Sequence, residues 1–329
     1  MDLTTINPGF TIAALISFAI AVIIGPLFIP FLKRLKFGQA IRAEGPQSHQ
    51  KKSGTPTMGG IIFLLSTLLT TLIGLIFWEG FELTSTLIML LLSLLGFGLI
   101  GFIDDFIIVV KKDNEGLRPK HKILGQFLLG AVFFYLFMRA GYSTVLNVFG
   151  VWRPDITWGY GIFVLFWLIG WPNATNITDG LDGLLSGISI IAFGVFGIIA
   201  AAQGQTEIML FCFTMVGALA GFLVFNLNPA KVFMGDTGSL AIGASLAAVS
   251  ILLKQEWLIL LIGFVYAVET GSVILQVLYF KATGGKRIFK MAPLHHHFEE
   301  SGWSERKVVT VFWGIALITG IIALHLIVF

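Results

Sequence analysis

The stretch FTIAALISFAIAVIIGPLFIPFLKR, residues 10–34, decides the fold class. Residues 10–32 carry no charge, and this run is longer than the roughly 20 residues that a helix needs to cross the bilayer core. It is also longer than the apolar core of a signal peptide, and its positive charges, Lys33 and Arg34, follow the run rather than precede it. We therefore expect a retained membrane-spanning helix whose amino end faces outward, since basic residues favour the cytoplasmic side.

Runs of the same kind recur along the whole chain. The sequence is 56% hydrophobic and only 12% charged, against a usual charged share of about 25%. Ten apolar runs are found, at residues 10–32, 58–78, 83–103, 123–138, 160–171, 184–202, 208–225, 240–253, 257–280 and 308–328. The sequence therefore predicts an all-α integral membrane protein with about ten transmembrane helices, formed by residues 1–329 as one polytopic domain without a separate soluble domain. The single Cys212 excludes an intrachain disulfide and a cysteine-based metal site.

The positions of lysine and arginine support this count. With ten spans and an outward amino terminus, 18 of the 21 basic residues fall in cytoplasmic segments, and only Arg139, Arg153 and Lys254 do not. The runs at 160–171 and 240–253 are short for about 30 Å of hydrocarbon. Losing either one would nevertheless invert part of the charge sorting, so we expect both to cross and both termini to lie outside.

Polar residues gather in the connections that this topology places at the cytoplasmic face. Ionisable groups embedded in membrane proteins are costly and usually functional, which predicts one shared site. The alternative is that each residue is only a helix end that meets water. The residues are Asp104 and Asp105 at the end of the third run; Asn173, Asn176, Asp179 and Asp182 after the fifth; Asn226, Asn228 and Asp236 after the seventh; and His295, His296 and His297 before the tenth.

The acids in this set suggest a divalent cation. Asp104 and Asp105 repel each other, and the helix dipole disfavours an acid at a helix C-terminus. Successive helical positions point about 100° apart, so we expect these two acids to divide roles. Asp236 fits either an N-cap of the following helix or a metal ligand. Mg²⁺ suits such a site because it takes one or two carboxylates and completes its shell with water and phosphate oxygens.

Basic and imidazole side chains belong to the same face. Lys52, Lys120 and Lys122 can attract anionic lipid headgroups or bind phosphate oxygens. Acids for a metal together with lysines for oxyanions fit phosphoryl transfer between a soluble diphosphate and a lipid-borne group. The three consecutive imidazoles, His295 to His297, suit substrate contact or a loop anchor better than zinc. Glu269, inside the ninth run, is expected to be a paired structural acid or a helix-kink partner rather than a catalyst.

Five segments carry a resemblance to a known family. They read KKSGTPTMGG at residues 51–60, GFIDD at 101–105, NATNITDGLDG at 173–183, NLNPAKVFMGDTGS at 226–239 and PLHHHF at 293–298. In this order, along essentially the whole chain, they resemble the bacterial phospho-N-acetylmuramoyl-pentapeptide transferases, a branch of the polyprenyl-phosphate N-acetylhexosamine-1-phosphate transferases. The acidic segments are shared by the wider family, whereas TPTMGG and the triple histidine favour the muramoyl branch.

The resemblance implies a ten-helix enzyme of the bacterial cytoplasmic membrane, usually a homodimer. Such an enzyme uses Mg²⁺ to transfer phospho-MurNAc-pentapeptide from UDP-MurNAc-pentapeptide to undecaprenyl phosphate, which gives lipid I and UMP in peptidoglycan synthesis. The implied partners are these two substrates and membrane lipids, and no nucleic acid is expected.

The resemblance also implies roles for individual residues. Asp104, Asp105 and Asp236 would be catalytic, with Mg²⁺ on Asp236 and with Asp105 and Asp179 as further candidate ligands. Lys120, Asn176 and Asp179 would lie near the diphosphate, and Lys52, Asp182, Asn226 and Phe233 around the uridine. The other implied substrate-binding residues are Thr57, Gly235, Gln276, His295, His296 and His297.

Two other functions stay open at the level of sequence. A sister enzyme that transfers GlcNAc-1-phosphate would share the acids, but it would not need the cationic and imidazole groups of residues 281–307, which suit the carboxylates of a peptide-bearing donor. A secondary transporter is disfavoured because the acids gather at one membrane face rather than near the midplane. Transfer can be direct or can pass through an aspartyl-phosphate, and either Asp104 or Asp105 can be the base.

Overall fold

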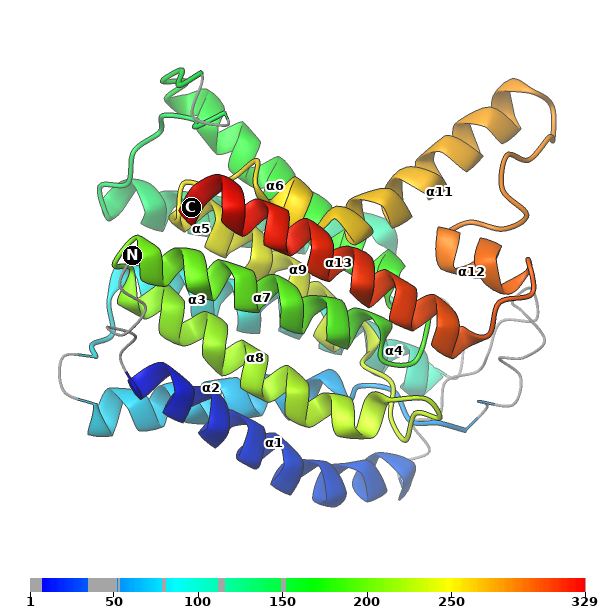
Figure 1. The fold of residues 1–329 in the computed structure, drawn as a ribbon, viewed down its shortest axis with the longest axis horizontal. Helices are drawn as coiled ribbons and strands as arrows, with labels where there is room; N and C mark the ends of the chain where they lie inside the picture. Colours follow the sequence, from blue (N-terminus) through cyan, green and yellow to red (C-terminus); the bar gives the residue numbers. More distant parts are fainter. Residues whose placement is uncertain are drawn as a thin grey trace.

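Helices make up nearly all of the regular structure (Figure 1). The structure is a computed structural model, and it describes residues 8–34, 52, 54–78, 81–111, 116–148 and 152–328. Within these ranges β-type pairing occurs only as isolated bridges, such as Val145 with Asp155 and Val148 with Trp152, and no strand is formed. The predicted all-α class is therefore confirmed.

The helices follow the predicted apolar runs closely in order and position. In chain order they are α1 (Pro8–Arg34), α2 (Gly60–Phe77), α3 (Ser85–Leu91), the π-helical turn η3 (Leu92–Gly96), α4 (Phe97–Lys111), α5 (Pro119–Arg139), α6 (Trp158–Thr178), α7 (Leu184–Ala202), α8 (Thr206–Asn226), α9 (Gly235–Leu252), α10 (Ile259–Ile262), α11 (Phe264–Ala282), α12 (Leu294–Glu299) and α13 (Glu305–Val328).

Among the described residues, eight helical segments are long and apolar enough to cross a membrane. One of them, residues 85–111, joins α3, η3 and α4 end to end. The eight include α9, so the predicted run at 240–253 lies in a helix of sufficient length. Of the predicted spans, α6 and α11 are outside this group. The chain is therefore a multi-pass membrane protein, and the count of ten stays a prediction.

Three helices differ from the predicted runs, and one of them is α6, which continues past the predicted end at residue 171 to Thr178. Asp104 and Asp105 were expected to close a helix, but α4 continues past them to Lys111, because both carboxylates are buried against other helices and apolar residues follow them. The predicted run at 257–280 is broken at Gly263, which separates the single turn of α10 from α11.

Helix α9 is the centre of the bundle. It packs against α2, α4, α6 and α7, and every residue from Thr237 to Leu252 is buried. Small residues allow these helices to approach closely. A Cβ atom at Gly243 would lie 2.3 Å from Thr175 Oγ1 on α6, and a Cβ atom at Gly101 on α4 would lie 2.1 Å from the Asp236 carbonyl oxygen. The first turn of α9 is thus held directly against α4.

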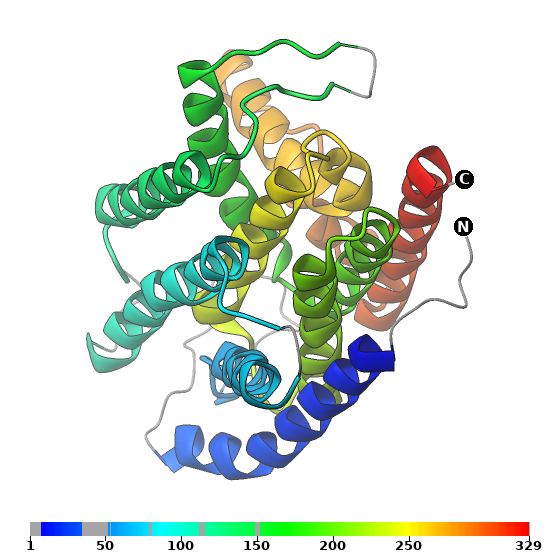
Figure 2. The same cartoon turned by 90° about the vertical axis from the view of Figure 1, so that its left-hand side faces the viewer.

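The two ends of the bundle are formed by different parts of the chain. The start of α1 and the end of α13 lie at one end, while α12 and the start of α13 lie at the other (Figures 1 and 2). Helix α11 leaves the bundle as a projecting arm (Figure 1), and its far half exposes Ile274, Leu275 and Leu278. Exposed apolar side chains on such an arm are suited to contact with lipid.

Candidate active site

Four carboxylates, Asp104, Asp105, Asp179 and Asp236, form what we call the acid cluster. Asp104 and Asp105 come from α4, Asp179 directly follows the end of α6, and Asp236 lies in the first turn of α9. Asp179 lies close enough to Asp105 and Asp236 for their negative charges to repel its own. The structure thus brings together acids that lie in three separate connections of the sequence.

Asp236 is the most highly connected member of the acid cluster. The Lys122 ammonium group on α5 pairs with its Oδ2 atom and lies 3.7 Å from Asp104 Oδ2. The Asn176 side chain on α6 donates a hydrogen bond of 2.7 Å to Asp236 Oδ1. Both oxygens of Asp236 therefore face polar groups from neighbouring helices, and one lysine is shared between two acids.

Asp105 caps the amino end of α9. It accepts hydrogen bonds from the backbone N–H groups of Asp236 (3.2 Å) and Thr237 (2.9 Å) and from the Thr237 hydroxyl (2.6 Å). A carboxylate at the amino end of a helix is stabilised by its unpaired N–H groups and its dipole. Because Asp105 fills this place from α4, the alternative role of Asp236 as the cap of its own helix is wrong. The Asp236 side chain is directed instead to Lys122 and Asn176.

Gly235 has a structural reason to be glycine. Its φ angle is +74°, and a Cβ atom there would lie 2.5 Å from Asp105 Oδ2 and 2.7 Å from the hydroxyl oxygen of Thr57. That hydroxyl is buried and has no hydrogen-bond partner in the described part of the chain. Thr57 and Gly235 therefore both border the acid cluster, as expected of substrate-binding positions.

A second polar group surrounds Lys52. Its ammonium group lies 2.8 Å from Asp182 Oδ1 and 2.6 Å from Glu305 Oε1. Asn228 donates to both acids, at 3.1 Å and 2.9 Å. Glu305 begins α13 and was not among the predicted site residues, although an acid at the start of a helix is a common stabilising arrangement. Glu305 therefore connects α13, the last helix of the chain, to the polar group around Lys52.

Asn226 and Phe233 hold the connection between α8 and α9. The Asn226 side chain accepts hydrogen bonds from the Gly183 N–H and the Ser186 hydroxyl and donates to the Val232 carbonyl oxygen. The backbone of Phe233 bonds to Pro56 and Gly59, so this connection lies along residues 56–59. The Asn226 amide is occupied by these contacts, while the Phe233 side chain is only partly buried.

Lys120 and Lys122 lie in different environments, which the sequence did not predict. Lys122 lies in the acid cluster, whereas Lys120, the residue implied by the family resemblance, is exposed and pairs with no acid among the described residues. Residues two apart on a helix point to different sides, so only one of them can face α4 and α9. The rotation of α5 about its axis therefore directs Lys122, and not Lys120, toward the acid cluster.

The three histidines have different environments. His295 is buried, and its Nδ1 atom lies 3.0 Å from Glu269 Oε2. The His296 Nδ1 atom lies 3.0 Å from Glu299 Oε2. His297 Nδ1 accepts a hydrogen bond from the Lys290 backbone N–H. The expected pairing of Glu269 is therefore found, and its partner is a histidine.

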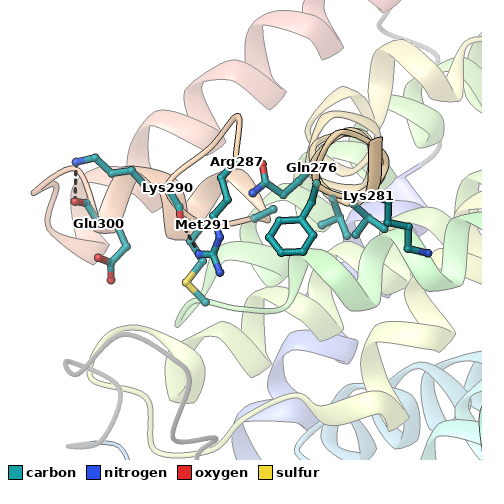
Figure 3. Close-up of a pocket in the computed structure, with 10 residues that line it drawn as sticks. Gln276, Lys281, Arg287, Lys290, Met291 and Glu300 are labelled. Carbon is teal, nitrogen blue, oxygen red and sulfur yellow. Dashed lines mark hydrogen bonds between the residues drawn. The ribbon is translucent and has the colours of Figure 1, made fainter. Parts of the chain in front are cut away.

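A cavity of about 660 Å³ lies between α11 and the connection that leads to α12 (Figure 3). Apolar side chains of α11 form one wall, and Lys281, Arg287, Lys290 and Glu300 supply charges around it. Gln276 accepts hydrogen bonds from the backbone N–H groups of residues 288 and 289, so it anchors the loop that carries Arg287. The Lys290 ammonium group donates to the Glu300 carbonyl oxygen (Figure 3).

The acid cluster favours an added cation. Burial, together with the negative charges of Asp236, Asp105 and Asp182, raises the pKa of Asp179 to about 8. Within the described ranges, no three Asp, Glu, His or Cys side chains form a ready metal cage. A site of one or two carboxylates fits Mg²⁺, which takes its remaining oxygens from water and phosphate. The donor set therefore fits a Mg²⁺ ion that is completed by a phosphorylated substrate.

Comparison with known proteins gives matches along nearly the whole chain. The family model described as glycosyl transferase family 4 matches residues 87–254, and the phospho-N-acetylmuramoyl-pentapeptide-transferase signature 1 matches residues 52–64. The chain is 55% identical to a phospho-N-acetylmuramoyl-pentapeptide-transferase of Listeria monocytogenes serotype 4b over 315 residues, which cover 95% of this chain and 97% of the relative. It is 55% identical to the protein of that name from Bacillus cytotoxicus over 98% of both chains. The protein of that name from Geobacillus kaustophilus is 52% identical, over 97% of this chain and 98% of the relative.

Proposed function

Because the chain belongs to the phospho-N-acetylmuramoyl-pentapeptide transferase family, we propose that its acid cluster is the Mg²⁺-dependent centre of that transfer. The reaction moves phospho-MurNAc-pentapeptide from UDP-MurNAc-pentapeptide to undecaprenyl phosphate, and it yields UMP and lipid I for peptidoglycan synthesis. The observation that carries the assignment of the centre is the convergence of Lys122 and Asn176 on Asp236, with Asp104 beside them.

The main barrier to this reaction is bringing two anions together. A phosphate monoester has a second pKa near 6, so the lipid phosphate is largely a dianion at neutral pH and is already a nucleophile. Mg²⁺, held by Asp236 with Asp179 and Asp105 as further candidates, supplies positive charge to the transferring phosphoryl group when it is bound. Lys122 adds a fixed positive charge at the same place.

Asp105 and Asp104, the other acids of the cluster on α4, have different proposed roles. Asp105 fixes the first turn of α9 and thereby the position of Asp236. Asp104 is held by the Leu117 backbone N–H and by Lys122, and it would accept the proton from the small fraction of lipid phosphate that is still protonated. The group around Lys52, with Asp182 and Phe233, would bind the uridine, and positioning of both substrates supplies much of the acceleration.

Removal of the metal tests the proposed centre. Purified protein with UDP-MurNAc-pentapeptide and undecaprenyl phosphate should release UMP in the presence of Mg²⁺, and EDTA should reduce the rate at least about 100-fold, because several kcal/mol of charge stabilisation are lost. Added Mg²⁺ should restore the rate, whereas added Na⁺ at equal ionic strength should not. Unchanged UMP release after metal removal would contradict the proposed cofactor.

We propose further that α6 and α11 complete ten spans, with both termini outside and the acid cluster at the cytoplasmic face of the bacterial inner membrane. The shared end of the start of α1 and the end of α13 supports an even number of crossings (Figure 1). The sorting of 18 basic residues to one side supports the orientation. A homodimer is the expected assembly.

Labelling of cysteine variants tests this orientation. Lys120 and Arg153 are both exposed, and they belong to opposite faces in the proposed topology. In a Cys212→Ser background, Arg153→Cys should react with an impermeant thiol reagent added to intact cells, and Lys120→Cys should react only after the membrane is opened. Labelling of Lys120→Cys from outside would invert the proposed orientation.

A further inference from the structure

A buried carboxylate and imidazole form a pair next to the acid cluster. Glu269 on α11 and His295 on α12 each have a side chain only 1% exposed. Glu269 Oε1 accepts the His295 backbone N–H at 3.1 Å, and Glu269 Oε2 lies 3.0 Å from the His295 Nδ1 atom. The carboxylate therefore holds both the start of α12 and the plane of the ring.

The other ring nitrogen of His295, Nε2, lies against Gly180, the residue after Asp179 of the acid cluster. Nε2 is buried and has no hydrogen-bond partner in the part of the chain that the structure describes. A Cβ atom at Gly180 would lie 2.1 Å from this nitrogen, so the ring packs directly on the turn that follows Asp179. A buried polar atom without a partner is costly, and a bound ligand would remove that cost.

The neighbouring histidines are engaged differently. His296 Nδ1 lies beside Glu299, and His297 Nδ1 accepts the Lys290 backbone N–H. Neither arrangement fixes a ring nitrogen against the turn at Gly180. His295 is thus the histidine whose orientation is set by a buried acid from another helix.

We propose that Glu269 is a positioning residue that sets the tautomer of His295. With the proton held on Nδ1 by the carboxylate, Nε2 of the neutral ring presents a lone pair. It accepts a hydrogen bond from an O–H or N–H group of the sugar-peptide donor that is bound at the acid cluster. This inference rests on the proposed function, since it assigns a role within that same site.

The same face of α11 links this pair to the charged cavity. Val273, Gln276, Val277 and Phe280 follow Glu269 at helical spacings of four, seven, eight and eleven residues, and all four line the cavity. A donor whose phosphate end lies at the acid cluster would therefore pass His295 before it reaches the cavity. His295 is placed where the sugar and the first part of the peptide would lie.

A double-mutant cycle tests the pair. Glu269→Gln keeps the size of the side chain but offers one acceptor oxygen to two N–H donors, so it should lower kcat/KM for UDP-MurNAc-pentapeptide about 10- to 100-fold. The KM for undecaprenyl phosphate should stay unchanged. In the His295→Ala background, Glu269→Gln should cause no further loss, because it acts through that ring. Losses that multiply would overturn the proposal.

A matched control separates positioning from general damage. Glu256 is also fully buried and hydrogen-bonded, but it pairs with Lys254 and Tyr160 at another part of the bundle. Glu256→Gln should leave the kcat/KM for the donor unchanged in protein that remains folded in detergent. Gly180→Ala should reproduce the donor defect, because the new methyl group displaces Nε2 without changing Glu269.

Nitrogen-15 spectra of histidine-labelled protein give a readout that does not depend on activity. The signals of His295 are identified by their loss in His295→Ala. They should show the proton on Nδ1 in the unmodified chain and a shift toward the Nε2–H tautomer in Glu269→Gln. An unchanged tautomer would refute the proposal even if the activity fell. Absent transfer in the unmodified chain, with the expected spectra, would instead count against the proposed function alone.

Discussion

Asp236→Asn should lower the rate of UMP release by about 100- to 1,000-fold while leaving the protein folded and inserted in the membrane. The asparagine keeps the shape of the side chain and one oxygen that can accept from Lys122 or Asn176. It loses the negative charge that would hold Mg²⁺ and balance Lys122. The expected defect therefore lies in the rate at saturating substrate rather than in folding.

The cap on α9 makes this substitution diagnostic. The amino end of α9 is capped by Asp105, so Asp236→Asn should not remove a cap and should leave the melting temperature in detergent nearly unchanged. Thr237→Val is a useful comparison, because it removes one hydrogen bond to Asp105 and leaves every carboxylate in place. Asp155→Asn, at an exposed carboxylate away from the acid cluster, should be neutral in both measurements. Near-normal turnover of Asp236→Asn would exclude Asp236 as the metal ligand.

The lengths of the apolar runs predicted the order of the helices well, but they predicted the ends of the helices poorly. Uncharged runs of 18 or more residues have few alternatives to a membrane helix, so the order of elements could be predicted from composition. The end of α4 could not be predicted in this way, because the pattern of charge alone suggests that the helix stops at its two acids. Asp105 remains inside the helix because the start of α9 supplies it with three hydrogen bonds from a distant part of the chain.

The composition of the site was predictable, while the choice among similar residues was not. Sorting polar residues by membrane face brought Asp104, Asn176 and Asp236 into one site. Choosing Lys122 over Lys120 requires the rotation of α5 about its axis, which a run of Lys-His-Lys does not fix. Glu269 was recognisable only as an acid that needs a partner, because its partner lies 26 residues away, beyond the connection between α11 and α12.

We expect the charged cavity to determine which donor the protein uses. A GlcNAc donor ends at a small neutral sugar, whereas a MurNAc-pentapeptide donor continues into a peptide with carboxylates. Arg287, Lys281 and Lys290 surround a cavity of about 660 Å³ that is large enough for part of such a peptide. Glu300 adds an opposite charge, which suits a ligand with both acidic and basic groups. These groups would gain nothing from UDP-GlcNAc.

UDP-MurNAc-pentapeptide should therefore be used at least 100-fold more efficiently than UDP-GlcNAc. Hydrogen bonds to charged partners are worth roughly 1.5 to 3 kcal/mol, so each lost contact reduces kcat/KM by at least about tenfold, and two or three contacts account for the expected ratio. Arg287→Ala should lower kcat/KM for the pentapeptide donor about tenfold, and His296→Ala should also weaken it. Arg153→Ala, at an exposed arginine in the connection before α6, serves as the control and should have no effect. Comparable UMP release from UDP-GlcNAc would show that the cavity does not select the donor and would favour the sister transferase activity, in which the acid cluster still acts on a polyprenyl phosphate but the peptide plays no part.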